Sequence, residues 1–189
     1  MLKPHQRMLL LLFGLFLLPI VAAWIFSAKL VDPRQFGLVN HGNLLDPPIE
    51  LADATWLDTA YPNGIPAAHW VVAEFYDPSD CDDTCDRVFQ HLSALPLVMG
   101  QEGPRITNLG VTLGEKGCEQ PDYPHCAALP IDEFDAVTRT IAERAGMAPE
   151  LPLVAFIDWR RNLMIAYPND FDPNHVKKDL KRLLKASRR

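Results

Sequence analysis

The sequence predicts an α/β fold in which one mixed β-sheet is flanked by helices and preceded by a single transmembrane helix. Two observations lead to this prediction. Short apolar segments with strand and helix patterns alternate through residues 69–189, and an uncharged apolar run occupies residues 8–28. Alternating strands and helices build a helix-covered sheet, and about 20 apolar residues are enough to cross a bilayer as a helix.

The apolar run predicts a retained membrane anchor behind a short cytoplasmic N-terminus, residues 1–7. Trp24 near the far end of the run suits a membrane interface. A cleaved signal peptide is the alternative, because residues 21–23 (VAA) read as a small-residue cleavage site. The apolar run continues beyond that site, which favours an anchor.

Charge alone leaves the orientation of this anchor open, because basic residues flank the run on both sides. N-terminal anchors generally export the following domain, and two close cysteine pairs suit an oxidising compartment. We therefore expect a single-pass protein of a bacterial-type inner membrane, with its domain in the periplasm. Residues 29–176 carry 9 basic and 23 acidic side chains, so nucleic acid is excluded as a partner because its phosphates would be repelled.

Residues 29–68 are predicted to be a tether and an irregular lead-in. The prolines at positions 47 and 48, and the Pro62-Asn63-Gly64 turn, interrupt any long helix or strand. The segment also contains apolar residues that predict packing onto the domain: Leu44, Leu45, Ile49, Leu51 and Trp56.

In the domain itself, residues 69–189, sequence patterns typical of strands alternate with patterns typical of helices. Apolar and branched runs of strand length, and stripes with helical spacing, follow one another in the order β-α-β-α-β-β-α. The predicted strands are residues 69–76, 105–112, 153–158 and 163–167, and the predicted helices are 83–95, 132–145 and 172–185. Two βα crossovers followed by a hairpin and a covering helix are the element order of the thioredoxin fold.

The residues that carry chemistry lie where the first of these strands turns into the first helix. Cys81 precedes the helix and should be accessible, whereas Cys85 begins its apolar stripe and should be sheltered. The unpaired N–H groups of a helix N-terminus favour a thiolate. Such a pair can exchange disulfides or hold a soft metal, and a structural disulfide across the loop is the alternative.

Five aspartates lie within ten residues of this pair. Negative neighbours oppose a thiolate but attract a cation, and thiolates select Cu(I) among the common metals. The balance favours metal binding or slow exchange over fast nucleophilic attack, although some of these acids can simply cap the helix. The second pair, Cys118 and Cys126, brackets a proline-rich loop and is interpreted as a structural disulfide, with a second redox or metal pair as the alternative.

The anchor, the element order and the C-x-x-x-C motif together resemble the Sco (SenC) family of copper-handling assembly factors for cytochrome c oxidase. The segment 40–48 (NHGNLLDPP) is similar to the tether of short Sco-like proteins. The resemblance implies copper held by Cys81 and Cys85, and an oxidase subunit as partner. That family also uses a histidine before the hairpin, but residues 148–153 (APELPL) contain none. His41, His91, His125 and His175 remain candidates for a third ligand.

Pro152 falls where thioredoxins carry a cis-proline beside their redox cysteines. A cis peptide bond and a trans proline that opens a strand are both compatible with the sequence. Three functions therefore follow from the sequence: a Sco-like factor that assists copper-site assembly, a membrane-tethered thiol–disulfide oxidoreductase, and a binding module whose cysteines are structural. In the second, Cys81 attacks and Cys85 resolves.

Overall fold

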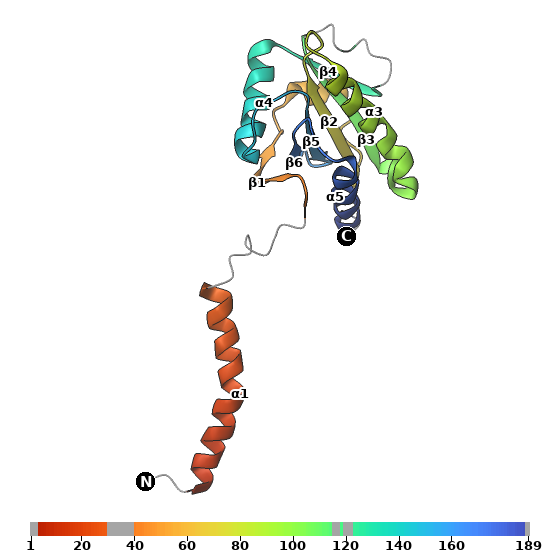
Figure 1. Cartoon of the computed structure of the whole chain (residues 1–189). Helices are drawn as coiled ribbons and strands as arrows, with labels where there is room; N and C mark the ends of the chain where they lie inside the picture. Colours follow the sequence, from red (N-terminus) through yellow and green to blue (C-terminus); the bar gives the residue numbers. More distant parts are fainter. Residues whose placement is uncertain (1–3, 30–39, 115–117, 119–122, 188–189) are drawn as a thin grey trace. The chain divides into compact units, whose positions relative to one another are not determined.

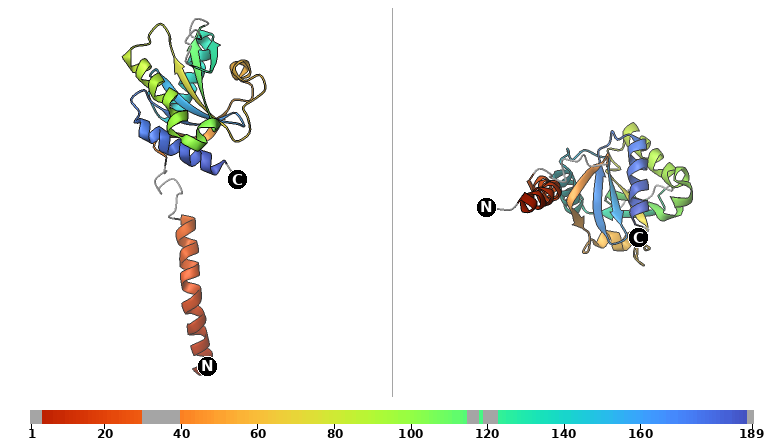
Figure 2. Two further views of the ribbon diagram at one scale, coloured as in Figure 1. Left: turned by 90° about the vertical axis from the view of Figure 1, so that its right-hand side faces the viewer. Right: turned by 90° about the horizontal axis from the view of Figure 1, so that it is seen from below.

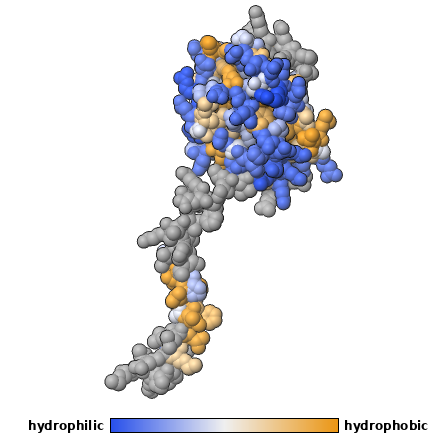
Figure 3. Space-filling model, in the orientation of Figure 1, coloured by the Kyte–Doolittle hydropathy of each residue, from blue (hydrophilic) through white to orange (hydrophobic). Residues whose placement is uncertain are grey.

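The computed structural model describes residues 4–29, 40–114, 118 and 123–187, and the chain divides into two compact units, Met1–Val39 and Asn40–Arg189. The first unit contains helix α1 (Pro4–Lys29). Its described large apolar side chains are exposed, and much of its described surface appears in the hydrophobic colour in Figure 3. Within the described ranges, no helix meets both the length and the apolarity that crossing a bilayer requires. The anchor at residues 8–28 therefore stays a prediction.

The second unit is built on a mixed sheet, as the sequence predicts. Within the described residues its strands are β1 (Asn43–Glu50), β2 (Trp70–Tyr76), β3 (Ile106–Leu113), β4 (His125–Leu129), β5 (Leu153–Asp158) and β6 (Asn162–Tyr167). Their order across the sheet is β1-β6-β5-β2-β3-β4. β2, β3 and β4 run parallel, whereas β5 is antiparallel to β2, and β6 and β1 continue in antiparallel fashion. β2 therefore lies in the interior of the sheet, and all seven of its residues are buried.

Helices cover both faces of this sheet (Figures 1 and 2). α3 (Asp83–Val98) and α5 (Pro173–Ala186) pack on one face through Val88, Leu92, Leu95, Val176, Leu180 and Leu184. α2 (Thr55–Ala60) and α4 (Ile131–Ala145) pack on the other, and a short 3₁₀ helix (Gly100–Arg105) leads into β3. Gly146 adopts the left-handed conformation with φ 64° and ends α4, which only glycine does without a steric penalty.

The lead-in is more regular than the sequence predicts, because residues 43–50 of the expected irregular segment form β1 and residues 55–60 form α2. β1 lies at the edge of the sheet and pairs antiparallel with β6, and its register is interrupted between Leu44 and Ile49. Edge strands tolerate proline because only one side of the strand needs a donor. Pro47 and Pro48 occupy this interruption, and the Asp46–Pro47 peptide bond is cis. The same prolines that indicate a broken segment therefore lie inside a strand.

The lead-in packs tightly onto the domain, as its apolar residues predict. Leu45, Leu51 and Trp56 are buried in the core. The guanidinium group of Arg161, in the β5–β6 turn, donates hydrogen bonds to the carbonyl of Leu51 at 3.0 Å and to that of Ala54 at 2.9 Å. One side chain of the hairpin thus holds the chain between β1 and α2.

A buried carboxylate on α5 fixes the beginning of the domain. Asp179 is 1% exposed, and its Oδ2 accepts hydrogen bonds from the backbone N–H groups of His41 at 2.6 Å and Gly42 at 2.9 Å, and from the Tyr167 hydroxyl at 2.7 Å. Burial alone would raise the pKa of Asp179, but these hydrogen bonds hold it below its usual range. The carboxylate therefore stays ionised while it ties residues 41 and 42 to α5.

Candidate functional site

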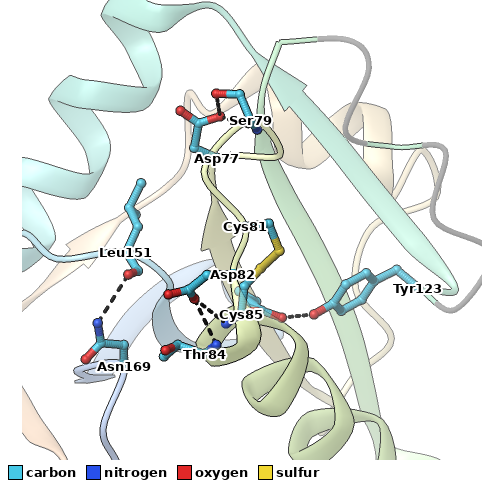
Figure 4. The surroundings of a disulfide bond; sticks show 10 residues. Asp77, Ser79, Cys81, Asp82, Thr84, Cys85, Tyr123, Leu151 and Asn169 are labelled. Atoms are coloured by element: carbon cyan, nitrogen blue, oxygen red, sulfur yellow. Dashed lines mark hydrogen bonds between the residues drawn. A yellow bond between two sulfur atoms is a disulfide. The ribbon is translucent and has the colours of Figure 1, made fainter.

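The first cysteine pair forms a disulfide at the β2–α3 turn, with the Cα atoms of Cys81 and Cys85 5.3 Å apart (Figure 4). Cys85 lies in the first turn of α3 and is 5% exposed, whereas Cys81 lies in the preceding turn and is half-buried. The predicted contrast between an accessible and a sheltered sulfur is therefore confirmed. An incoming group reaches Cys81 more easily than Cys85.

The disulfide opens into a hollow of about 260 Å³. Its lining includes Tyr76, Asp77 and Asp80 from the β2–α3 segment, and Pro149, Leu151 and Pro152 from the segment before β5. The Leu151–Pro152 peptide bond is cis. The fold thus brings Pro152 beside the cysteine pair, as its position in the sequence suggests, and its part in any chemistry stays a prediction.

The segment before Pro152 is held by the loop after β6. The side-chain amide of Asn169 donates a hydrogen bond of 3.2 Å to the carbonyl of Leu151, and Figure 4 shows this bond beside the start of α3. The loop after β6 therefore helps to fix Leu151 and Pro152, which line the hollow opposite the disulfide.

Asp82 caps α3, which confirms that some of the acids serve the helix. Its Oδ1 accepts hydrogen bonds from the backbone N–H groups of Thr84 at 2.8 Å and Cys85 at 3.4 Å. These bonds, the one from Thr84 first, lower the pKa of Asp82. A carboxylate thus occupies the helix N-terminal donors that would otherwise stabilise a thiolate. The site offers little help to a negatively charged sulfur.

The candidate third ligands lie elsewhere in the domain. His41 contacts Asp179 on α5, His125 on β4 stacks on Tyr61 with ring centroids 4.3 Å apart, and His91 is exposed on α3. None of these histidines lines the hollow, and neither does His175, which stacks on His41. Among the described residues, no three or more His, Cys, Asp and Glu side chains are grouped to hold a metal ion.

A buried carboxyl group on β2 was missed by sequence reasoning. Glu74 is 1% exposed, and burial raises its pKa to about 8. The Tyr123 hydroxyl donates a hydrogen bond to Glu74 Oε2, while Oε1 has no hydrogen-bond partner among the residues that the structure describes. The available signal was a single acid inside the otherwise apolar run HWVVAEFY, since buried carboxyl groups are rare without a partner.

The second cysteine pair is also a disulfide. Cys118 and Cys126 have Cα atoms 5.5 Å apart, and Cys126 lies in β4 opposite Gly110 of β3. The predicted pairing is therefore present in the fold. This disulfide ties Cys118 to β4 at the edge of the sheet.

Solved structures with a similar arrangement include copper-bound ScoI from Arabidopsis thaliana (10% identity, 64% of this chain and 86% of that chain, TM-score 0.45). Another is the thioredoxin domain of a thiol-disulfide oxidoreductase from Bacteroides vulgatus (13% identity, 62% of this chain and 80% of that chain, TM-score 0.43). A third is the exposed lipoprotein thioredoxin Etrx1 from Streptococcus pneumoniae (18% identity, 61% of this chain and 85% of that chain, TM-score 0.39). Likenesses this distant say nothing about activity.

No curated protein sequence matches the chain. The family described as "transmembrane-like, thioredoxin-like, C-terminal domain" matches residues 70–187. This region begins at β2 and contains the first disulfide, Pro152 and the whole of α5. Because the match covers more than half of the chain and agrees with the strand order and the covering helices, the chain belongs to this thioredoxin-like family.

Proposed function

We propose that the protein is a thiol–disulfide oxidoreductase that uses Cys81 and Cys85. The observation that carries the proposal is the disulfide at the start of α3, which opens into a hollow walled on the opposite side by Pro152. One sulfur of the pair is accessible and the other is sheltered. That asymmetry suits two-step exchange, because one sulfur is available for a mixed disulfide while the other stays within reach to resolve it.

The oxidising direction runs through a mixed disulfide. A client thiolate attacks Sγ of Cys81, the Cys81–Cys85 bond breaks, and Cys85 leaves as a thiolate that takes up a proton. A second client thiolate then attacks the client sulfur of the mixed disulfide and releases Cys81, which is protonated in turn. Two electrons and two protons pass from the client dithiol to the protein, and the reverse sequence reduces a client disulfide.

Exchange by this site should be moderate in rate rather than fast. Asp82 already occupies the first N–H groups of α3, and Asp77 and Asp80 line the hollow. Carboxylates at these positions disfavour a thiolate at Cys81. This environment suits a small set of clients better than general oxidation of exposed thiols.

The test uses the full chain and a small dithiol or disulfide substrate. Cys81→Ser is expected to abolish turnover, whereas Cys85→Ser is expected to keep a reactive Cys81 and to accumulate a mixed disulfide, measurable as added mass. The matched control is the double variant Cys118→Ser/Cys126→Ser, which removes the second disulfide but retains turnover. If turnover survives loss of either Cys81 or Cys85, both cysteines are structural and the protein is a binding module.

We propose that this reaction takes place at a bacterial-type inner membrane, on the periplasmic side. The uncharged run at residues 8–28 and the exposed apolar side chains of α1 support the membrane, and two disulfides support an oxidising compartment. Fractionation of cells that express the full chain, followed by protease treatment of spheroplasts, tests both. Recovery of the chain in the cytosolic fraction, or protection from protease in spheroplasts, contradicts this location.

Copper-site assembly of a cytochrome c oxidase is the second candidate, favoured by the pairing of two soft sulfur ligands in an acidic hollow. The residues present do not complete a metal site, because no histidine lines the hollow. A further ligand would have to come from a partner such as an oxidase subunit. Titration of the reduced full chain with Cu(I) tests this candidate. A 1:1 complex that Cys81→Ser removes supports it. If no complex forms, copper-site assembly is rejected and disulfide exchange is the function that is left.

A further inference from the structure

A tyrosine close in sequence to the second disulfide, Tyr123, packs against both β3 and α3. Tyr123 is three residues before Cys126, and its ring lies directly over Gly110 on β3, where an added Cβ would come within 3.1 Å of the ring. Its ring stacks on Tyr76 with centroids 6.2 Å apart and meets Phe89 of α3 edge-on at 4.8 Å. These contacts place a residue of the β3–β4 segment under α3.

The hydroxyl of Tyr123 reaches the buried carboxyl group of Glu74. Glu74 and Tyr76 lie on the same face of β2, because side chains alternate along a strand, and Tyr76 lines the hollow with the first disulfide. Phe89 is one helical turn from Cys85 and lies on the same side of α3. In Figure 4 the dashed line from the Tyr123 hydroxyl marks the hydrogen bond that it donates to Glu74.

We propose that Tyr123 is a positioning residue for the Cys81–Cys85 pair, that its hydrogen bond lowers the pH at which the buried Glu74 ionises, and that the Cys118–Cys126 disulfide keeps Tyr123 in place. The state of the second disulfide then regulates the first. This inference rests on the thiol–disulfide exchange proposed above.

The geometry also fixes the direction of the effect. A hydroxyl that donates to a carboxylate stabilises the charged form, and Tyr123 is the hydrogen-bond donor to Glu74. The neighbours of Glu74 in the sheet, Gly110 on β3 and Val154 on β5, have no titratable side chain. Among the described residues, the titratable groups that interact with Glu74 are Tyr123, which donates the hydrogen bond, and Tyr76 on its own strand, whose pKa is raised by burial and then by the charge of Glu74. Loss of the Tyr123 hydroxyl should therefore keep Glu74 protonated to higher pH.

When Glu74 ionises, its charge lies on the strand face that also carries Tyr76, which lines the hollow, and a nearby carboxylate disfavours a thiolate. The pH profile of the exchange rate should therefore contain an inflection from Glu74. Opening the second disulfide by a dithiol reductant breaks the Cys118–Cys126 bond, oxidises the reductant to its disulfide and leaves two thiols. Tyr123 then loses this covalent restraint and keeps its ring contacts and its hydrogen bond.

The experiment compares the pH dependence of exchange in the full chain and three variants. Tyr123→Phe keeps the ring and its packing but removes the hydroxyl, and it is expected to move the inflection upward by about one pH unit or more. Cys118→Ser/Cys126→Ser is expected to move it in the same direction. In a Glu74→Gln background the inflection is absent, and adding Tyr123→Phe changes nothing further.

An unmoved inflection in Tyr123→Phe, or in the Cys118/Cys126 double variant, overturns the proposal. So does an effect of Tyr123→Phe that persists without the Glu74 carboxyl group. A second readout separates this outcome from a failure of the proposed function: titration of the Glu74 side-chain carbon by NMR in the oxidised protein needs no exchange activity. Its midpoint is expected to rise in both Tyr123→Phe and the double variant, and an unchanged midpoint refutes the assignment whether or not the protein exchanges disulfides.

Discussion

The clearest prediction concerns the pH dependence of stability that the buried carboxyl group of Glu74 creates. Burial raises its pKa from 4.5 to about 8 in the folded protein, so the folded chain binds this proton more tightly than the unfolded chain. The stabilisation is complete below pH 4.5 and is lost as the pH rises through 8. Each pH unit between the two pKa values is equivalent to about 1.4 kcal/mol. The interval from 4.5 to 8 therefore amounts to roughly 5 kcal/mol, a large part of the stability of an ordinary domain.

Replacement of Glu74 by Gln removes the titrating group but preserves the shape and an acceptor for the Tyr123 hydroxyl. The new amide NH₂ takes the place of Oε1, which has no partner among the described residues. An unpaired buried NH₂ group should lower the free energy of unfolding by about 1–3 kcal/mol at every pH. Relative to the wild type, the free energy of unfolding of Glu74→Gln should therefore begin lower at pH 4.5 and rise by roughly 5 kcal/mol by pH 9.

Urea unfolding of the oxidised full chain at several pH values from 4.5 to 9 measures this difference. Glu143→Gln makes the same chemical change at an exposed position on α4, and its difference from the wild type should stay flat. A constant difference between Glu74→Gln and the wild type over the whole range would refute the reasoning, because the carboxyl group would then titrate alike in the folded and unfolded chains.

Two further predictions concern the acids that hold backbone N–H groups. Asp82→Ala removes the cap of α3 and should lower the free energy of unfolding at pH 7, while Asp82→Asn should keep most of this stability; an equal loss in both variants would show that the side chain does not act as a cap. Asp179→Ala leaves the N–H groups of His41 and Gly42 and the Tyr167 hydroxyl unpaired and should cost about 3 kcal/mol. Because the pKa of Asp179 is lowered, its contribution is present above pH 3.8 and lost as the pH falls further. Urea unfolding at pH 7 and at pH 3 tests this, and an equal cost at the two values contradicts it.

The parts of the fold that the sequence predicts well are those with one strong periodic pattern. β2 and β5 are short apolar runs buried on both faces, and α4 carries an apolar stripe that ends at Gly146. Each of these patterns is local, so it can be read without knowledge of the rest of the sheet. The β2–α3 turn follows directly from its two neighbours, which is why the cysteine pair was placed correctly.

The missed elements depend on neighbours that are distant in the sequence. β1 is a strand only because β6 offers an edge, and no local pattern distinguishes its prolines from those of a loop. β4 has five residues and pairs with β3 along one side. The Glu74–Tyr123 contact joins residues 49 positions apart. Such a contact is created by the register of β2, β3 and the segment before β4, and that register appears only in the folded chain.

The edge position of β1 decides where this protein can be cut. A fragment that starts at residue 70, as the family region does, lacks both β1 and α2. Without β1, β6 would become an exposed edge strand with unpaired backbone groups, and without α2 the core surface that Trp56 and Leu57 cover would be exposed. Exposed apolar edge strands pair with other chains and cause aggregation. An expressible fragment should therefore begin near Asn40, where the compact unit begins.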